Sequence, residues 1–305
     1  MNFWVHYMPL KPRNEGSNEK ETHHIPSTKA ELVNTLTEDG VLLHGALFEP
    51  DSIGSVAAFI IHGAWGNFYT GLGRFLPAAL AASGIACLSL NNRGHDYGTV
   101  ADGNPCIGLL REQFEDSPKD IAAGLNLLKE KGYKRIVLIG HSYGTAKAVY
   151  SQVINPDPEV ESLILCTPSV LMRDAWKHYL DVPYNEAVRE ATRLVNEKQG
   201  ERFVIFRHFG PAPLICTART FLSVWGPTTA MDVLQYIGEL AKPLLITICE
   251  LDLMFMDCTR ALYEHANRAD PCEFIVIPGG DHYYIGAERS LKKLICSWLH
   301  KLRLI

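Results

Sequence analysis

Short apolar segments alternate with segments of helical periodicity along most of the chain. Runs rich in Val and Ile, such as 56–61 and 135–139, have the length of buried strands and are far too short to span a bilayer. The apolar spacing at 76–82, 119–130 and 287–301 predicts helices. Strands that are buried on both faces and connected by helices indicate an α/β fold with a mostly parallel sheet.

Two turn signals mark the ends of predicted elements. Gly40 lies between two apolar segments and supplies the positive φ that a tight turn requires, which predicts a hairpin starting near residue 31. Asp116 precedes Ser117 and Pro118, and this order predicts a helix whose first amides are capped by the Asp116 side chain.

The alternation of strands and helices stops between about residues 169 and 240. This region has helical patterns and no obvious buried strand run, so we predict a helical cap inserted into the sheet domain, over the ends of its strands. On this division, residues 29–168 and 241–305 form the core, 169–240 form the cap, and the polar residues 1–28 form an N-terminal extension. The aromatic residues of the predicted cap are Trp176, Tyr179, Tyr184, Phe203, Phe206, Phe221 and Trp225.

The composition argues against several classes of partner and location. The 305 residues are 47% hydrophobic and 21% charged, enough to bury a core in one large domain or a domain with an insertion. The formal net charge of −5 and the lack of a basic run argue against nucleic acid as a partner. No secretory signal or transmembrane segment is recognisable. The eight cysteines lack CxxC spacing, so we expect buried thiols, no metal ligands and a cytoplasmic protein.

The strongest chemical signal is the segment Gly140-His141-Ser142-Tyr143-Gly144, which follows an apolar strand pattern and precedes a helical one. A G-x-S-x-G turn in this context exposes the serine hydroxyl above the edge of a sheet. The helix that follows directs its N-terminal amides at the place where negative charge develops in the transition state. The pattern alone arises by chance, but the strand and the helix around it favour Ser142 as a nucleophile over a simple turn serine.

A serine hydroxyl needs a base, and the base needs a group that orients it. His282 follows the last strand pattern in a Gly-rich loop and is the predicted base. For the acid, Asp252 after the strand pattern 244–249 is favoured over the nearby Glu250. Asp281 directly precedes the base and is more typical of a turn-forming carboxylate. One of the two amides that would hold an oxyanion is that of Tyr143, the residue after the nucleophile.

Five motifs occur in a fixed order over about residues 30–300, and together they resemble those of the α/β-hydrolase superfamily: HGAWG, NNRGHD, GHSYG, ELD and GGDH. Within it, the chain looks like cap-bearing esterases, lipases and serine-peptidase-like hydrolases. A weaker likeness, carried by GHSYGTAKAVYS and the length, points to the branch of siderophore-ester hydrolases. The resemblance implies the α/β-hydrolase fold, with the order nucleophile, acid and histidine along the chain.

The resemblance also implies roles for two loops. HGAWG looks like the family's oxyanion loop, which implies the backbone N–H of Ala64 as the second donor and that of Trp65 as the alternative. Asp252 stands three residues after Cys249, where the family commonly has glycine. NNRGHD resembles a stretch of many lysophospholipase-like and esterase-like members. Its polar side chains are expected to hold loops by hydrogen bonds and ion pairs: Arg93, His95 and Asp96.

These residues predict a serine hydrolase that forms an acyl-enzyme on Ser142 and needs no metal or organic cofactor. The expected partner is a small-molecule substrate with an ester or related acyl bond; the oligomeric state stays open. Aromatic residues near the site favour a largely apolar pocket: Trp65, Phe68, Tyr69, Tyr283 and Tyr284. Acyl transfer, thioester or carbon–carbon cleavage, a ligand receptor without catalysis, and an inert interaction module are the alternatives.

Overall fold

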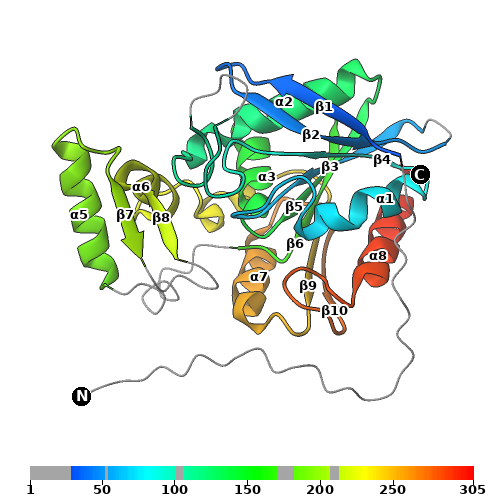
Figure 1. The fold of residues 1–305 in the computed structure, drawn as a ribbon. Helices are drawn as coiled ribbons and strands as arrows, with labels where there is room; N and C mark the ends of the chain where they lie inside the picture. Colours follow the sequence, from blue (N-terminus) through cyan, green and yellow to red (C-terminus); the bar gives the residue numbers. More distant parts are fainter. Residues whose placement is uncertain (1–28, 52–53, 101–105, 170–181, 207–212) are drawn as a thin grey trace, which may run out of the picture.

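The centre of the protein is an eight-stranded sheet (Figure 1), in a computed structural model that describes residues 29–51, 54–100, 106–169, 182–206 and 213–305. The strand order is β1-β2-β4-β3-β5-β6-β9-β10. Only the β1–β2 and β2–β4 pairs are antiparallel, which confirms the predicted mostly parallel sheet. The strands are β1 (Glu31–Leu36), β2 (Leu42–Phe48), β3 (Val56–Ile61), β4 (Ala86–Leu90), β5 (Arg135–His141), β6 (Val160–Cys166), β9 (Leu244–Cys249) and β10 (Cys272–Ile277).

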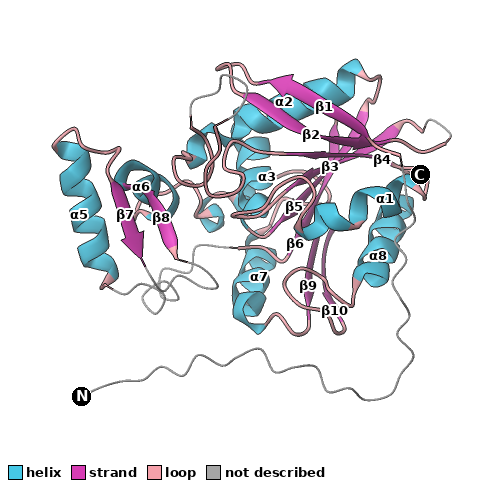
Figure 2. Ribbon diagram, viewed as in Figure 1, coloured by secondary structure: helices cyan, strands magenta, loops and turns pink. Residues whose placement is uncertain are grey.

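Helices cover both faces of this sheet (Figure 2). Along β3, Phe59 and Ile61 belong to one apolar cluster, whereas Ala58 and Ile60 belong to another, because successive side chains of a strand point to opposite faces. The first cluster includes residues of α2 (Ser117–Glu130), α3 (Tyr143–Ile154) and α7 (Leu253–His265), and the second includes residues of α1 (Leu76–Ala81) and α8 (Glu288–Lys301). Within the described ranges, no helix is long and apolar enough to cross a membrane.

The two turn signals had different outcomes. Gly40 has a φ of 82° and joins β1 to β2, so the hairpin is confirmed. The prediction that the Asp116 side chain caps α2 is wrong, because no side-chain cap bond forms there. Residues Phe114–Asp116 already form a 3-10 turn that runs into the helix. The Asp116 carboxylate instead lies 2.8 Å from Lys119 Nζ and 3.4 Å from the Arg93 guanidinium.

The segment between β6 and β9 contains strands as well as helices. Its elements are α5 (Tyr184–Asn196), β7 (Phe203–Phe206), β8 (Leu214–Thr217), α6 (Ala218–Trp225) and 3-10 turns at Val233–Gln235 and Ile237–Glu239. The strands β7 and β8, which pair antiparallel, were not predicted, because each has four residues and β7 is largely exposed. Figure 1 shows α5, β7, β8 and α6 beside the core sheet. The expected extension at 1–28 and the aromatic residues Trp176 and Tyr179 lie outside the described residues.

All eight cysteines are free, and five of them are buried. This confirms the prediction of thiols rather than disulfides. The thiols of Cys87 and Cys166 lie inside the sheet, and burial raises the pKa of each well above its usual range. These cysteines therefore act as small apolar side chains of the core.

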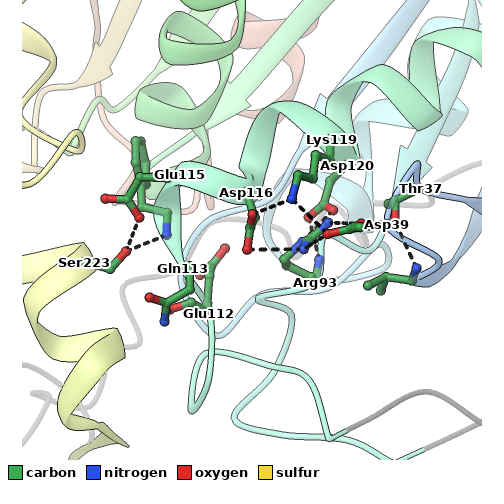
Figure 3. A network of polar contacts seen from close by, with 12 residues as sticks. Thr37, Asp39, Arg93, Glu112, Gln113, Glu115, Asp116, Lys119, Asp120 and Ser223 are labelled. Atoms are coloured by element: carbon green, nitrogen blue, oxygen red, sulfur yellow. Dashed lines mark hydrogen bonds and ion pairs between the residues drawn. The ribbon is translucent and has the colours of Figure 1, made fainter. Parts of the chain in front are cut away.

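Arg93 joins the loop after β4 to the hairpin and to α2 (Figure 3). Its Nε donates a hydrogen bond of 2.8 Å to Asp120, and its two terminal nitrogens donate to Asp39 at 2.9 and 3.0 Å. These hydrogen bonds hold the pKa of Asp39 well below its usual range. In the same loop, Asp96 lies 2.8 Å from His95 Nδ1 and accepts a 3.0 Å bond from the side chain of Asn67. The expected loop-holding contacts of this segment are thus confirmed.

Replacement of Arg93 by Met should lower the free energy of unfolding by about 3–5 kcal/mol, because the Asp120 carboxylate is buried and loses its partner. Urea unfolding at pH 7, followed by circular dichroism, measures this loss. The control is Arg193→Met, since Arg193 makes two ion pairs on the exposed surface of α5 and should change the unfolding midpoint little. Equal effects of the two substitutions would contradict a special role of the buried network.

Candidate active site

Ser142 occupies a sharp turn between β5 and α3. Its backbone has φ 53° and ψ −123°, a conformation that a side-chain-bearing residue adopts only when its surroundings hold it there. The Ser142 N–H donates to the Cys166 carbonyl at the end of β6, and the Ser142 carbonyl accepts from Thr145 in α3, each at 3.0 Å. The turn is therefore fixed by the neighbouring strand and by the helix that follows.

The two glycines of the motif are required by close backbone approach. A Cβ atom on Gly144 would lie 2.2 Å from the carbonyl oxygen of Ile61 at the end of β3. A Cβ atom on Gly140 would lie 2.6 Å from the Cα of Thr145. Both distances are shorter than any ordinary contact, so the first turn of α3 reaches the sheet edge only with glycine at these positions.

His282 and Asp252 meet at the carboxyl ends of the neighbouring parallel strands β9 and β10. The His282 Nδ1 atom lies 2.8 Å from Asp252 Oδ2. Asp252 is 7% exposed and directly precedes α7, whereas His282 is partly exposed in the loop after β10. Because a carboxylate only accepts hydrogen bonds, this contact places the ring proton on Nδ1 and leaves Nε2 as the acceptor.

The other two candidate carboxylates are occupied elsewhere. Glu250 accepts a hydrogen bond from the Gly279 amide at 3.1 Å. Asp281 accepts from the amides of Tyr283 and Ile285 at 2.9 and 3.0 Å, which is the turn-forming role expected for it. Of the three, only Asp252 has a hydrogen bond to the imidazole of His282.

His141 links the serine turn to the histidine loop, which the sequence did not indicate. Its Nε2 lies 2.8 Å from the carbonyl oxygen of His282. Burial lowers the pKa of His141 to about 3, so the ring is neutral and Nε2 must carry the proton to donate to a carbonyl. The two imidazole rings lie 5.2 Å apart. The residue before the serine therefore fixes the backbone of the candidate base.

The early loop packs against the serine, as the family's oxyanion loop would. A Cβ atom on Gly63 would lie 3.0 Å from the Cβ of Ser142, so this backbone touches the candidate nucleophile. Gly66 N–H donates to the Gly63 carbonyl at 3.1 Å and closes a turn in which Trp65 has a φ of 56°. Ala64 follows Gly63 directly within this turn, so its amide comes one residue after the backbone that contacts Ser142.

His62 holds this early loop in place. The amide of Asn92 donates to His62 Nε2 at 3.0 Å, so the ring proton is on Nδ1, which lies 2.8 Å from the Gly63 carbonyl. Burial lowers the pKa of His62 to about 3, which keeps this tautomer neutral. On the other side of Ser142, the Tyr143 amide opens α3 and has no intrahelical acceptor. Two amides thus flank the serine from different elements.

Ser142, Asp252 and His282 line one cavity of about 580 Å³. Val224, Trp225 and Met231, from the segment between β6 and β9, line the same cavity. Among its described lining residues, Asp252 has the only carboxylate and none has an ammonium or guanidinium group. The described part of the chain contains no cluster of His, Cys, Asp or Glu placed to hold a metal ion.

The predicted pocket residues divide into two groups. Trp65 and Tyr283 line the cavity, whereas Phe68, Tyr69 and Tyr284 are absent from its lining. The rings of Phe68 and Tyr69 instead pack 5.1 Å apart. Tyr284 is fully buried in the core. Proximity to the motifs in the sequence did not distinguish the two groups. Three further aromatic residues of the lining come from other segments of the chain: Tyr97, Trp225 and Phe255.

The sequence matches the alpha/beta hydrolase family over residues 41–290, and the chain belongs to this family. Its structure is similar to that of the esterase Pf2001 of Pyrococcus furiosus, with 18% identity, coverage of 90% of this chain and 91% of that one, and a TM-score of 0.61. It is also similar to Est1E of Butyrivibrio proteoclasticus with ferulic acid bound, at 16% identity, 88% and 98% coverage and a TM-score of 0.66. A third similar structure is that of the α/β hydrolase GrgF of Penicillium, with 16% identity, coverage of 90% of this chain and 98% of that one, and a TM-score of 0.67. No curated protein matches the sequence significantly.

Replacement of His141 by Phe should lower kcat/KM for an ester substrate by about tenfold. The carbonyl of His282 then loses its hydrogen-bond donor, and the candidate base is no longer held in position. His141→Gln retains an N–H donor and should lose less. Steady-state kinetics on both variants measure the difference. His265→Phe is the control, since His265 makes a similar bond to a carbonyl on the exposed side of α7. An unchanged rate in His141→Phe would contradict the positioning role.

Proposed function

We propose that this protein is a serine hydrolase that cleaves an ester or related acyl bond of a small, largely apolar substrate through an acyl-enzyme on Ser142. The observation that carries the proposal is the 2.8 Å contact between His282 and Asp252, in the same cavity as the strained turn of Ser142. A base that is oriented by a buried carboxylate and shares a cavity with a serine hydroxyl is the arrangement that activates serine.

In the proposed first step, His282 Nε2 takes the hydroxyl proton while Ser142 Oγ attacks the carbonyl carbon. The resulting oxyanion accepts hydrogen bonds from the amides of Ala64 and Tyr143. Asp252 stabilises the imidazolium through Nδ1. When the bond to the leaving oxygen breaks, the imidazolium gives it the proton, and the acyl group stays on Ser142. Water then attacks the acyl carbon in the same way, with His282 as base, and releases the acid.

The lining of the cavity supports an uncharged substrate. Apart from Asp252, which is engaged by His282, its described lining residues carry no carboxylate, and none of them carries an ammonium or guanidinium group to pair with an anionic substrate. Burial of an unpaired charge is costly, so an ionised acyl chain is disfavoured there. The esterase title of the Pyrococcus protein supports an ester as the bond, and the ferulic acid in Est1E supports an acyl group with an apolar body. The eight free thiols support a reducing, cytoplasmic setting.

A fluorophosphonate probe should label the wild-type protein on Ser142, because it reacts with activated serines. Ser142→Ala should abolish labelling, and His282→Ala should lower ester turnover by about three orders of magnitude or more. Asp252→Asn should also lower turnover strongly, since it favours the wrong tautomer of His282. Mass spectrometry of the labelled peptide and ester hydrolysis rates measure these outcomes.

The matched control is Glu250→Gln, two residues from Asp252, which removes a negative charge, keeps an acceptor oxygen for the Gly279 amide and should keep most of the activity. Turnover in Ser142→Ala close to that of the wild type would refute the proposal. Ligand binding without turnover or labelling in the folded wild type would favour a receptor. Product analysis with added alcohols or thiols would reveal acyl transfer.

Two p-nitrophenyl esters with four-carbon acyl chains test the substrate class. The butyrate should be hydrolysed with a kcat/KM at least about tenfold higher than the hydrogen succinate, because the terminal carboxylate of the latter finds no ammonium or guanidinium group among the described residues that line the cavity. The uncatalysed hydrolysis rate of each ester serves as the reference. Equal efficiency on both esters would contradict an uncharged substrate.

A further inference from the structure

Two opposite charges are buried outside the candidate triad. The ammonium group of Lys147 and the carboxylate of Glu112 are in direct contact, and their side chains are 1% and 0% exposed. Lys147 lies in α3, five residues after Ser142, and Glu112 lies in the loop before α2. A buried ion pair stabilises a fold little compared with apolar residues of the same shape, so its presence needs another explanation.

Both charges meet the side chain of Tyr143, whose amide is a proposed oxyanion donor. Lys147 is one helical turn after Tyr143, and its Nζ lies 4.6 Å from the centre of the Tyr143 ring, a favourable cation–π distance. Burial, and next the negative charge of Glu112, raise the pKa of the Tyr143 phenol well above its usual range. The ring of Tyr143 thus packs against the cation, and the carboxylate that pairs with this cation acts on its phenol group.

Gly94 gives the Glu112 carboxylate its place. A Cβ atom on Gly94 would lie 2.1 Å from Glu112 Oε2 and 2.2 Å from its carboxyl carbon. No larger residue fits unless the carboxylate moves. The neighbouring Arg93 fixes this loop through Asp39 and Asp120 (Figure 3). The glycine of the NNRGHD motif therefore serves the contact between Glu112 and Lys147.

The segment that carries Glu112 also anchors α6. The Thr217 amide donates to the carbonyl of Leu110 at 2.8 Å. Ser223 accepts a 2.8 Å bond from the Phe114 amide and donates a 2.5 Å bond to Glu115 (Figure 3). Val224 and Trp225 follow Ser223 in the sequence and line the cavity. Residues 110–115, which we name the anchor segment, therefore contact both the substrate-cavity helix α6 and the nucleophile helix α3.

We infer that Glu112 and Lys147 are positioning residues that hold the first turn of α3 so that the Tyr143 amide meets the oxyanion. This inference rests on the proposed function. The pair acts through Tyr143 and touches neither substrate nor reacting atoms. Because Glu112 lies in the anchor segment, the alignment of the oxyanion hole depends on the same loop that holds α6 over the cavity.

The test compares Glu112→Gln, Lys147→Met and the double variant. Each single substitution leaves a buried charge without its partner and should destabilise the fold, whereas the double variant removes both charges and should regain the wild-type unfolding midpoint. The double variant should nevertheless keep a kcat about tenfold below the wild type, with KM within about twofold, because the oxyanion is bound only in the transition state.

A trifluoromethyl ketone with an apolar chain provides a second measurement, since Ser142 adds to it and places an oxyanion in the hole. Its affinity for the double variant should fall by about the same factor as kcat. The affinity of the corresponding methyl ketone, which is the control ligand, should stay unchanged. Recovery of both kcat and trifluoromethyl ketone affinity together with stability would overturn the inference and leave the pair a purely structural role.

Glu112→Asp keeps the inference testable if the double variant does not fold. It retains both charges but withdraws the carboxylate by one methylene, so kcat should fall while KM and the extent of fluorophosphonate labelling of Ser142 stay near those of the wild type. A wild-type kcat in a folded Glu112→Asp protein would overturn the positioning role and leave the proposed hydrolase intact. Absence of labelling in the wild type would refute the proposed function itself, and this inference with it.

Discussion

The site depends on backbone contact between the first turn of α3 and the end of β3. Gly144 lies so close to the Ile61 carbonyl that no side chain fits between them. This contact brings the serine turn beside Gly63, and the Ser142 amide of the turn donates a hydrogen bond to the Cys166 carbonyl of β6. The strained φ of Ser142 is thus maintained by three parallel strands at once, which is why a conformation unfavourable for an isolated serine persists in the fold.

Neutral buried histidines connect the loops around this turn. His62 joins the early loop to the loop after β4, and His141 joins the serine turn to the loop after β10. Burial keeps both rings uncharged at neutral pH, so each has a fixed tautomer with a defined donor. His141 therefore connects the segments of Ser142 and His282, and His62 connects the early loop to the loop after β4, through directional hydrogen bonds that add no charge to the cavity.

Local signals predicted much of the core, but contacts between distant segments were beyond them. The buried strands, the Gly40 hairpin and the glycines around Ser142 follow from apolar runs and steric demands that a few residues reveal. Glu112 and Lys147 are 35 positions apart in the chain, and from the sequence alone each would be expected to be a charged side chain exposed to solvent. The strands β7 and β8 were missed for a related reason, because their stability comes from pairing with each other rather than from a buried apolar run.

The cavity is lined on one side by the central sheet and on the other by α6, which the anchor segment holds by hydrogen bonds. Ser142, Asp252 and His282 stand at the ends of strands in the central sheet, where neighbouring strands fix their relative positions. Val224 and Trp225 belong to α6, whose hydrogen bonds to the core are concentrated on the anchor segment. Glu112 of that segment also forms the buried charge pair next to Tyr143. On the proposed function, a change in the position of α6 would reach the Tyr143 amide through Glu112 and Lys147, so the proposal links substrate fit to the alignment of the oxyanion donors.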